Sequence, residues 1–232
     1  MTNSTANKIN KPSRPPFIRD IDRSRPIGGQ IYEAVRLNII LENLKPREPI
    51  NETDLAAWFG VSRTPVRDAY LRLIEDGLIN AQYKVGTIVA PIDEARVREG
   101  IIIRRALERE VVKIICEGTT DLRSLDKIIA LQSVAVSHND HIEFFRLDEE
   151  FHAELAELAS LPSAWRLAYS VKAHTDRARI MLTGNMPNRI NIAFQEHLGL
   201  VEALVARDGE LAQALIAKHI NSAIEAVQEH AK

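Results

Sequence analysis

The sequence has one cysteine, no long apolar run and no apolar segment near its N-terminus. The single thiol of Cys116 excludes an internal disulfide, and its place in an apolar run indicates a small buried side chain. No apolar run approaches the roughly 18 residues that a membrane-spanning helix needs. Residues 1–25 are polar and lack the apolar core of a secretory signal peptide. These absences predict a cytoplasmic protein without a membrane partner.

A strong net charge is also absent, because the formal net charge of the 232 residues is −2. That balance conceals an asymmetry between the two parts of the chain. Residues 1–91 hold 13 Lys and Arg against 10 Asp and Glu, whereas residues 92–232 hold 17 against 22. A basic N-terminal part is expected of a module that binds phosphate. Apolar residues make up 45% of the chain, which is enough for a packed core.

The N-terminal part of the sequence divides into an arm and a compact module. Residues 1–25 contain three prolines and few apolar side chains, which predicts a flexible arm. Residues 26–91 predict three helices followed by a hairpin, which is the layout of a winged helix-turn-helix. The expected helices cover about 27–44, 51–59 and 64–76, and the expected strands cover 78–83 and 87–90.

The centre of this module, residues 55–67, predicts a helix, a tight turn at Gly60 and a second helix. Thr64 before Pro65 is typical of an N-cap followed by proline in the first helical turn. The second helix of such a motif presents its first residues to the major groove. Arg63 and Arg67 share one helix face and suit guanine edges, and the hydroxyls of Ser62 and Thr64 suit phosphate oxygens.

After Pro91 the sequence contains no strand pattern. Helical periodicity recurs instead, with breaks at glycine, proline or asparagine. The six expected helices cover about 93–117, 122–137, 142–159, 164–182, 189–206 and 210 to the end. The predicted fold class is therefore mainly α, with an N-terminal winged helix-turn-helix and a C-terminal all-α bundle in residues 92–232.

Short runs in residues 27–91 match one known pattern. They are Tyr32-Glu33-Ala34-Val35-Arg36, Leu44-Lys45-Pro46, Glu52-Thr53-Asp54-Leu55-Ala56, Gly60-Val61-Ser62-Arg63-Thr64-Pro65-Val66-Arg67-Asp68-Ala69 and Gly77-Leu78-Ile79. With these runs the segment resembles the DNA-binding domain of GntR-family bacterial transcription regulators. The resemblance implies that Arg36 also contacts DNA, and that Lys84 and Gly86 belong to a wing that approaches a groove.

Residues 92–232 resemble the FCD effector domain of the FadR-type branch of that family, in its smaller six-helix version. The runs that carry this resemblance are Asp148-Glu149-Glu150-Phe151-His152, Gln195-Glu196-His197, Ala206-Arg207-Asp208 and Ala217-Lys218-His219-Ile220. The resemblance implies a metal site formed by Asp148, His152, His197 and His219. Helical spacing agrees, because Asp148 and His152 share one helix face while His197 and His219 fall on two later helices. One carboxylate and three imidazoles suit a divalent metal such as Zn²⁺ or Ni²⁺.

In the family that this segment resembles, a small organic acid binds in the cavity that holds the metal. Arg104 matches an arginine that faces this cavity, and a guanidinium there favours a carboxylate. The alternative for Arg104 is an ion pair with Glu108, four residues later on the same helix.

The two resemblances together predict a metabolite-responsive repressor and not an enzyme. We expect its helical domain to form a homodimer that presents two winged helices to a palindromic operator in double-stranded DNA. Two alternatives stay open from the residues. One is a metalloenzyme of the bundle type, against which no His-Glu-x-x-His motif occurs. The other is a metal that serves structure alone or is itself the sensed signal.

Overall fold

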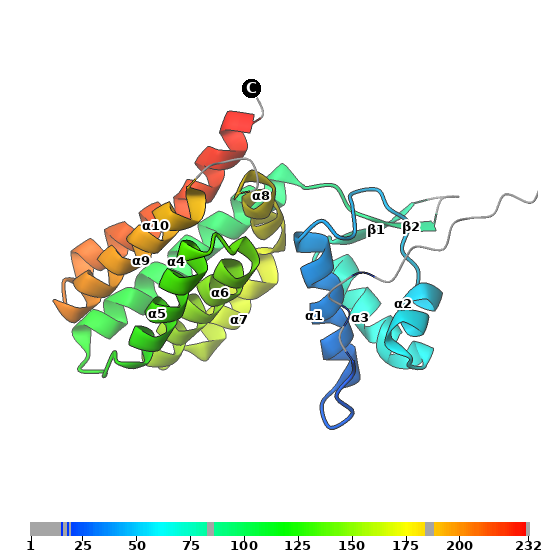
Figure 1. Ribbon diagram of the computed structural model, residues 1–232, viewed down its shortest axis with the longest axis horizontal. Coiled ribbons are helices and arrows are strands. Elements are labelled where there is room, and N and C mark those ends of the chain that lie inside the picture. The colour runs from blue at the N-terminus through cyan, green and yellow to red at the C-terminus, as the bar shows by residue number, and fades with distance from the viewer. Residues whose placement is uncertain (1–14, 16–17, 19, 83–85, 184–187, 231–232) are drawn as a thin grey trace, which may run out of the picture. The chain divides into compact units, whose positions relative to one another are not determined.

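The structure, a computed structural model, describes residues 15, 18, 20–82, 86–183 and 188–230, with the backbone alone at 182–183 and 223–230. The chain divides into two compact units, Met1–Pro91 and Ile92–Lys232. Figure 1 shows the elements of each unit. In the described residues, no helix is both long and apolar enough to cross a membrane.

Over its described residues, the first unit contains three helices and a two-stranded sheet (Figure 1). The helices are α1 (Ile27–Ile40), α2 (Glu52–Phe59) and α3 (Arg63–Glu75), and the strands are β1 (Ile79–Gln82) and β2 (Gly86–Val89). The strands are antiparallel, with Ile79 opposite Val89. Helix α1 packs on α3 through buried apolar side chains, and this contact forms the core of the unit. The predicted winged helix-turn-helix architecture is thereby confirmed.

Local chemistry fixes the turn between α2 and α3. The side chain of Asn51 caps α2 by accepting a hydrogen bond from the backbone N–H of Asp54. Gly60 ends α2 in the left-handed conformation, with φ of 62°, which glycine adopts without steric cost. Helix α3 begins at Arg63, two residues before Pro65, the first helical position expected after the predicted N-cap Thr64. Ser62 is therefore the N-cap, and Thr64 lies in the first turn with Pro65, whose missing N–H is not needed there.

Helix α1 ends earlier than its apolar pattern indicates. The expected helix reached residue 44, but α1 stops at Ile40 and Glu42 takes a left-handed conformation with φ of 55°. The backbone N–H groups of Asn43 and Leu44 both donate to the carbonyl of Asn38 and close the helix end. Leu44 is still buried, although it lies in the turn after α1. Its apolar side chain fits the helical spacing of α1, which explains why the sequence predicted a longer helix.

The second unit is a bundle of α-helices over its described residues (Figure 1). The helices are α4 (Glu94–Glu117), α5 (Ser124–Ser137), α6 (His141–Leu158), α7 (Pro162–Val171), α8 (Ala173–Thr183), α9 (Arg189–Val205) and α10 (Gly209–His230). Helix α10 packs along α4 and α9, and α5 packs along α6. Apolar side chains from α4, α6, α9 and α10 fill the interior. Cys116 is part of this core, as expected.

One expected helix, residues 164–182, is two helices in the structure, so the described part of the bundle has seven helices and not six. The break falls at Lys172, where no glycine or proline marks it. The Lys172 ammonium is buried and bound to Glu149 of α6 and to Asp176, the latter at 2.6 Å. A Cβ atom on Gly100 of α4 would lie only 2.6 Å from the carbonyl oxygen of Val171. Tertiary contacts therefore cause the break, which explains why the local sequence did not predict it.

Candidate metal centre and DNA-binding surface

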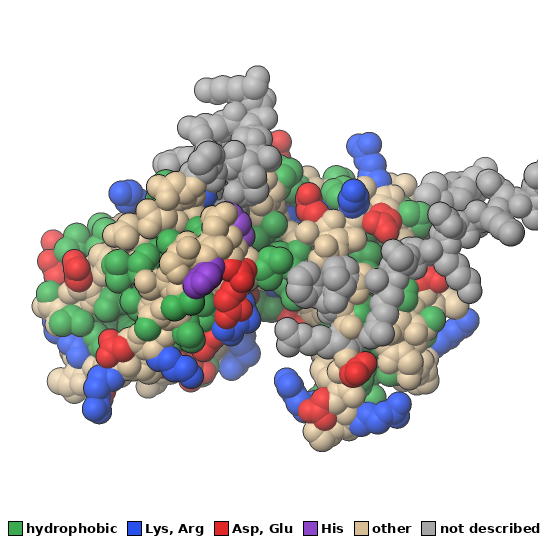
Figure 2. Space-filling model, in the orientation of Figure 1, with side chains coloured by type: hydrophobic (Ala, Val, Ile, Leu, Met, Phe, Trp, Pro, Cys, Tyr) green, Lys and Arg blue, Asp and Glu red, His purple; other side chains and the backbone are tan. Residues whose placement is uncertain are grey.

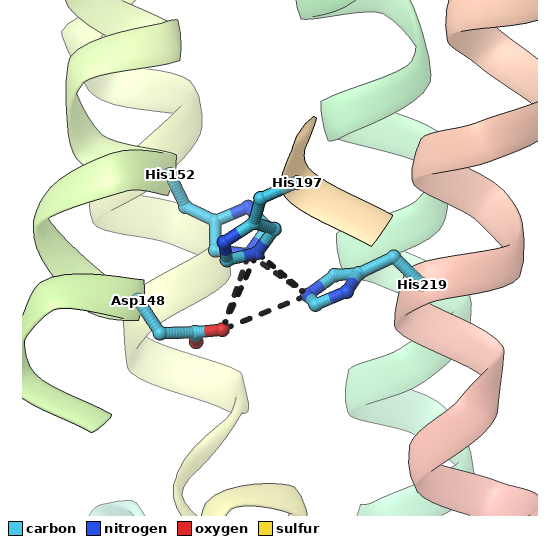
Figure 3. A group of neighbouring side chains, drawn as sticks. All are labelled: Asp148, His152, His197 and His219. Carbon is cyan, nitrogen blue, oxygen red and sulfur yellow. Dashed lines mark hydrogen bonds and ion pairs between the residues drawn. The ribbon is translucent and has the colours of Figure 1, made fainter. Parts of the chain in front are cut away.

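Four buried side chains converge inside the helical unit. Asp148 and His152 come from α6, His197 from α9 and His219 from α10 (Figure 3). One ligand atom from each of the four lies within 4.8 Å of the others. The Nε2 atom of His219 is 3.3 Å from the Nε2 atoms of His152 and His197. The Oδ1 atom of Asp148 is 3.5 Å from Nε2 of His197 and 3.6 Å from Nε2 of His219. The structure therefore brings together all four residues that the sequence proposed as metal ligands.

An oxygen atom faces the outer nitrogen of each imidazole. Nδ1 of His197 is 2.9 Å from Oε1 of Gln132, and Nδ1 of His219 is 2.9 Å from Oε2 of Glu196. Nδ1 of His152 is 2.6 Å from Oε2 of Glu108, an ion-pair contact in which neither atom has a hydrogen-bond partner among the described residues. A carboxylate or amide oxygen there favours the tautomer with hydrogen on Nδ1, which leaves the Nε2 lone pair directed at the centre of the group.

The charge states of the group agree with this tautomer. Burial, aided by the neighbouring His219, holds the pKa of His197 well below its usual value. Burial also lowers the pKa of His152, although Glu108 acts in the opposite direction. Burial opposes the ionisation of Asp148, but the Arg179 guanidinium outweighs it and holds the pKa of Asp148 well below its usual range. Near pH 7 His152 and His197 thus offer neutral imidazoles, and Asp148 offers an anionic carboxylate.

These observations test whether the residues fit a metal ion. Nitrogen lone pairs 3.3 Å apart repel one another unless a cation or a proton lies between them. Three imidazole nitrogens and one carboxylate oxygen are the donor set that Zn²⁺ and similar divalent ions take in proteins. Oxygen acceptors behind metal-bound imidazoles are a regular feature of such sites. The residues fit a divalent transition metal.

Two arginines lie close to the metal-ligand group, the name used below for Asp148, His152, His197 and His219. Arg179 of α8 donates from both terminal nitrogens to the two oxygens of Asp148, at 2.9 and 3.0 Å. Arg104 of α4 donates from Nε to Oε1 of Glu108 at 2.6 Å. Its Nη2 atom is buried and has no hydrogen-bond partner among the described residues. The ion pair with Glu108 that the sequence left open is therefore present, and it leaves one donor of the guanidinium unused.

Sequence reasoning found the four converging residues but missed those that orient them. Glu196 is adjacent to His197 in sequence, yet its carboxylate serves His219 on another helix. Gln132 and Arg179 come from helices that the metal pattern does not include. No sequence pattern marks these partners, because each is brought in by the packing of the bundle.

Four of the residues expected to bind DNA lie at the start of α3. Ser62, Arg63, Thr64 and Arg67 are all exposed, while Val66, Ala69 and Leu73 on the opposite face of α3 are buried. Gly86 opens β2 with φ of 97° and is exposed. Lys84 lies outside the described residues.

Arg36 on α1 differs from the exposed residues at the start of α3, because it is only 2% exposed. Its contact with DNA remains a prediction, and it requires the guanidinium to turn outward.

Comparison with known proteins agrees with both units. Residues 27–89 match the model described as bacterial regulatory proteins of the gntR family, and residues 101–222 match the FCD domain. The chain belongs to the GntR family of bacterial regulatory proteins. Members of this family are DNA-binding transcriptional regulators and not enzymes. FCD domains commonly bind metal, and the four converging residues of this regulator lie within the matched segment.

Individual relatives span almost the whole regulator. The HTH-type transcriptional repressor RspR of Escherichia coli K12 is 30% identical over 211 residues, which cover 90% of this chain and 92% of RspR. A probable D-xylose utilization operon repressor of Paenarthrobacter nicotinovorans is 29% identical over 84% of this chain and 85% of its own. The solved structure of E. coli McbR/YncC has a TM-score of 0.77 at 20% identity and covers 88% of this chain and 98% of its own. That likeness shows the shared fold.

Proposed function

We propose that this GntR regulator is a metabolite-responsive repressor whose operator binding is controlled from a metal-containing site in its helical unit. Residues 26–91 bind the operator, and residues 92–232 sense the effector and form the dimer. The observation that carries the proposal is the convergence of four buried ligand atoms within 4.8 Å, in a chain that also has a helix-turn-helix.

The DNA-binding part of the proposal rests on the exposed start of α3. Arg63 and Arg67 read base edges in the major groove, and Ser62 and Thr64 bind backbone phosphates. Arg36, Lys84 and Gly86 complete the contact from α1 and from the wing. RspR and the D-xylose operon regulator both carry the name repressor, which favours repression over activation.

The sensing part of the proposal rests on the charges around the metal ligands. Asp148, His152, His197 and His219 hold a divalent metal, with Zn²⁺ or Ni²⁺ favoured by the nitrogen-rich donor set. The effector is a small organic acid that binds beside the metal. Arg104 contributes the donor for its carboxylate, because Nη2 is buried without a partner among the described residues.

A homodimer on a palindromic operator follows from the two-fold logic of helix-turn-helix proteins. Large apolar side chains lie exposed on the helical unit, among them Ile102, Val134, Leu167 and Val205. Figure 2 shows hydrophobic side chains spread over the visible face of that unit. Exposed apolar side chains of this kind favour an interface with a second copy of the chain, which supports dimerisation. DNA in bacteria lies in the cytoplasm, which is where we place the regulator.

Metal analysis combined with thermal unfolding tests the proposal. The purified protein is assayed for metal content, and its melting temperature is measured with small carboxylic acids, with and without a chelator. We expect a divalent metal to copurify, and some acids to raise the melting temperature only in its presence. Those acids should then release a DNA fragment that the protein has selected from genomic DNA.

Other outcomes of these experiments distinguish a structural metal from a metal that is itself the sensed signal. If chelation unfolds the helical unit and no acid binds, the metal is structural and the sensing proposal is wrong. If the metal alone changes operator affinity, the metal is itself the signal. DNA binding would stand in either case, since it depends on the first unit.

A further inference from the structure

The chain immediately before α1 is folded into a closed turn. The backbone N–H of Arg25 donates to the carbonyl oxygen of Asp22 at 3.2 Å, as in a β-turn of residues 22–25. The Oδ1 atom of Asp22 accepts from the backbone N–H and from the hydroxyl of Ser24, at 2.9 and 2.6 Å. Contacts of an aspartate side chain with the backbone two residues later stabilise such turns. The carboxylate of Asp22 is therefore used inside the turn.

One glutamine fixes this turn to the first helix. The Nε2 atom of Gln30, on α1, donates to the carbonyl oxygen of Asp22 at 2.8 Å, and its Oε1 atom accepts from the backbone N–H of Asp22 at 2.9 Å. Nε2 also lies 3.3 Å from the carbonyl oxygens of Arg25 and Pro26. Because Gln30 binds both backbone groups of Asp22, the turn has a fixed place at the start of α1.

The turn lies next to the start of α3. A Cβ atom on Gly28, in the first turn of α1, would lie 3.3 Å from the carbonyl oxygen of Pro65 and 3.4 Å from Cβ of Asp68. The first turns of α1 and α3 therefore pack against each other, and the turn that precedes α1 lies beside the exposed residues that begin α3. Figure 1 shows this turn as the dark blue loop at the lower end of the first unit.

Two arginines of the turn have no use within the described part of the chain. Arg23 and Arg25 are both exposed, and neither guanidinium makes a hydrogen bond or an ion pair with the described residues. The nearby carboxylates have other neighbours, since Asp22 binds Ser24 and Asp68 lies against the first turn of α1. The carboxylate of Asp68 disfavours an anion at the N-terminus of α1, so the two guanidinium groups are the anion-binding groups of this surface.

The position of these arginines identifies the anion that they fit. When α3 lies in the major groove, elements beside its first turn face the sugar-phosphate backbone that borders the groove. Arginine is one of the side chains that bind backbone phosphates, and such contacts set the register of a protein on the duplex. The turn holds its two guanidinium groups two positions apart, without a partner among the described residues to displace. A DNA strand can therefore bind them at little cost in ordering the backbone.

We propose that the turn of residues 22–25 binds the DNA backbone beside the major groove through Arg23 and Arg25, and that Gln30 positions this turn. The inference rests on the DNA-binding part of the proposed function, with α3 in the groove, and is independent of the metal and the effector. Contacts to phosphate carry no sequence information. The turn therefore strengthens binding to every DNA sequence by the same factor.

The salt dependence of binding tests this role. Each phosphate contact to B-DNA contributes about 0.9 to the slope of log affinity against log salt concentration. Fluorescence anisotropy of the full-length protein measures this slope with a fragment selected by the wild type and with an unrelated duplex of equal length. When Arg23→Gln and Arg25→Gln are combined, we expect the slope to become shallower by about 1.8 for each bound chain. The affinity for both duplexes should fall at least tenfold at about 0.1 M salt.

Two further variants separate the turn from charge alone. Arg47→Gln removes an exposed guanidinium that lies beyond the other end of α1, a helix of 14 residues and so about 20 Å long. This control should keep the slope of the wild type. Gln30→Ala keeps both arginines of the turn but frees the turn from α1, so it should keep the slope and weaken binding to both duplexes, because the turn must then be ordered on binding. Circular dichroism establishes that each variant is folded.

The contrary outcomes are distinct from failure of the proposed function. An unchanged slope in the double variant would overturn the phosphate contact, and so would an equal change in Arg47→Gln. A loss confined to the selected fragment would show that the arginines read bases, which contradicts the inference. Wild-type affinity in Gln30→Ala would overturn the positioning role. A wild type that selects no DNA would overturn the proposed function as well, whereas the other results leave that function intact.

Discussion

The two units of this regulator place their candidate functional residues in opposite environments, one exposed and one buried. The first unit carries four of its proposed DNA-binding side chains at the start of one helix, where Arg63 and Arg67 lie four positions apart and are both exposed. The second unit brings its proposed metal ligands from three helices into the interior, and Asp148 and His219 are 71 positions apart in the sequence. The first arrangement depends on local structure, whereas the second depends on the packing of the bundle.

This difference determines how a substitution should act in each unit. A side chain exposed on α3 has few partners, so its removal changes DNA binding and little else. A side chain in the metal-ligand group has partners on several helices, so its removal changes both metal binding and the local packing. Matched substitutions in the two units are therefore the most direct test of the comparison.

The largest effect is expected for His197→Ala. His197 supplies one of the converging Nε2 atoms, and its ring stacks on Phe151 with centroids 4.2 Å apart. Loss of an outer partner of a metal ligand already costs about 10- to 100-fold in affinity, and loss of the ligand itself should exceed that. Competition with a fluorescent chelator measures the Zn²⁺ affinity. An affinity equal to that of the wild type would show that the metal binds elsewhere.

The second effect is expected for Arg67→Ala in the first unit. One bidentate contact between arginine and guanine contributes about 1–3 kcal/mol, so operator affinity should fall by about 5- to 150-fold. The Zn²⁺ affinity should not change, since Arg67 belongs to the other unit. Fluorescence anisotropy with a DNA fragment selected by the wild type measures the loss, and Arg166→Ala controls for the change in charge. A loss of metal binding with unchanged DNA binding would contradict these roles.

The sequence predicted more of the first unit than of the second. Local motifs identified the turn at Gly60 and the exposed residues of α3, because an N-cap and a left-handed glycine are encoded within a few positions. The four proposed metal ligands were found through spacing and resemblance. The partners that orient the ligands were not found, since Gln132 and Arg179 reach them only through the bundle. The break at Lys172 escaped for the same reason, because its cause is a buried ion pair with another helix.

The third prediction concerns pH and applies to the metal-free protein. Burial lowers the pKa of both His152 and His197, so the unfolded chain binds protons at a pH where the folded chain does not. Stability is therefore full above the unfolded value of about 6.5 and falls as the pH drops below it, by about 1.4 kcal/mol per pH unit for each histidine. Urea unfolding of the helical unit at pH 7.5 and 5.5 measures the loss. The DNA-binding unit has no histidine between residues 26 and 91 and serves as the internal control.

The smallest effect is expected for Glu196→Gln. Glu196 accepts from Nδ1 of His219 at 2.9 Å, and this contact holds the pKa of Glu196 below its usual value although burial opposes it. The glutamine amide has a shape similar to that of the carboxylate but lacks its negative charge. That charge makes the His219 imidazole more basic and so a stronger ligand for a metal ion. We expect the Zn²⁺ affinity to fall about tenfold, at the lower end of the range for outer partners. Glu202→Gln, which changes an exposed carboxylate on the same helix, should leave it unchanged.

This variant also distinguishes charge from geometry at the metal site. Glu196→Ala removes both the charge and the acceptor, so it should weaken Zn²⁺ binding more than Glu196→Gln does. If the two variants weaken binding equally, the charge of Glu196 accounts for its whole contribution. If neither variant changes the Zn²⁺ affinity, packing alone holds His219 in place. The dependence of the buried site on partners from several helices would then be limited to the four proposed ligands.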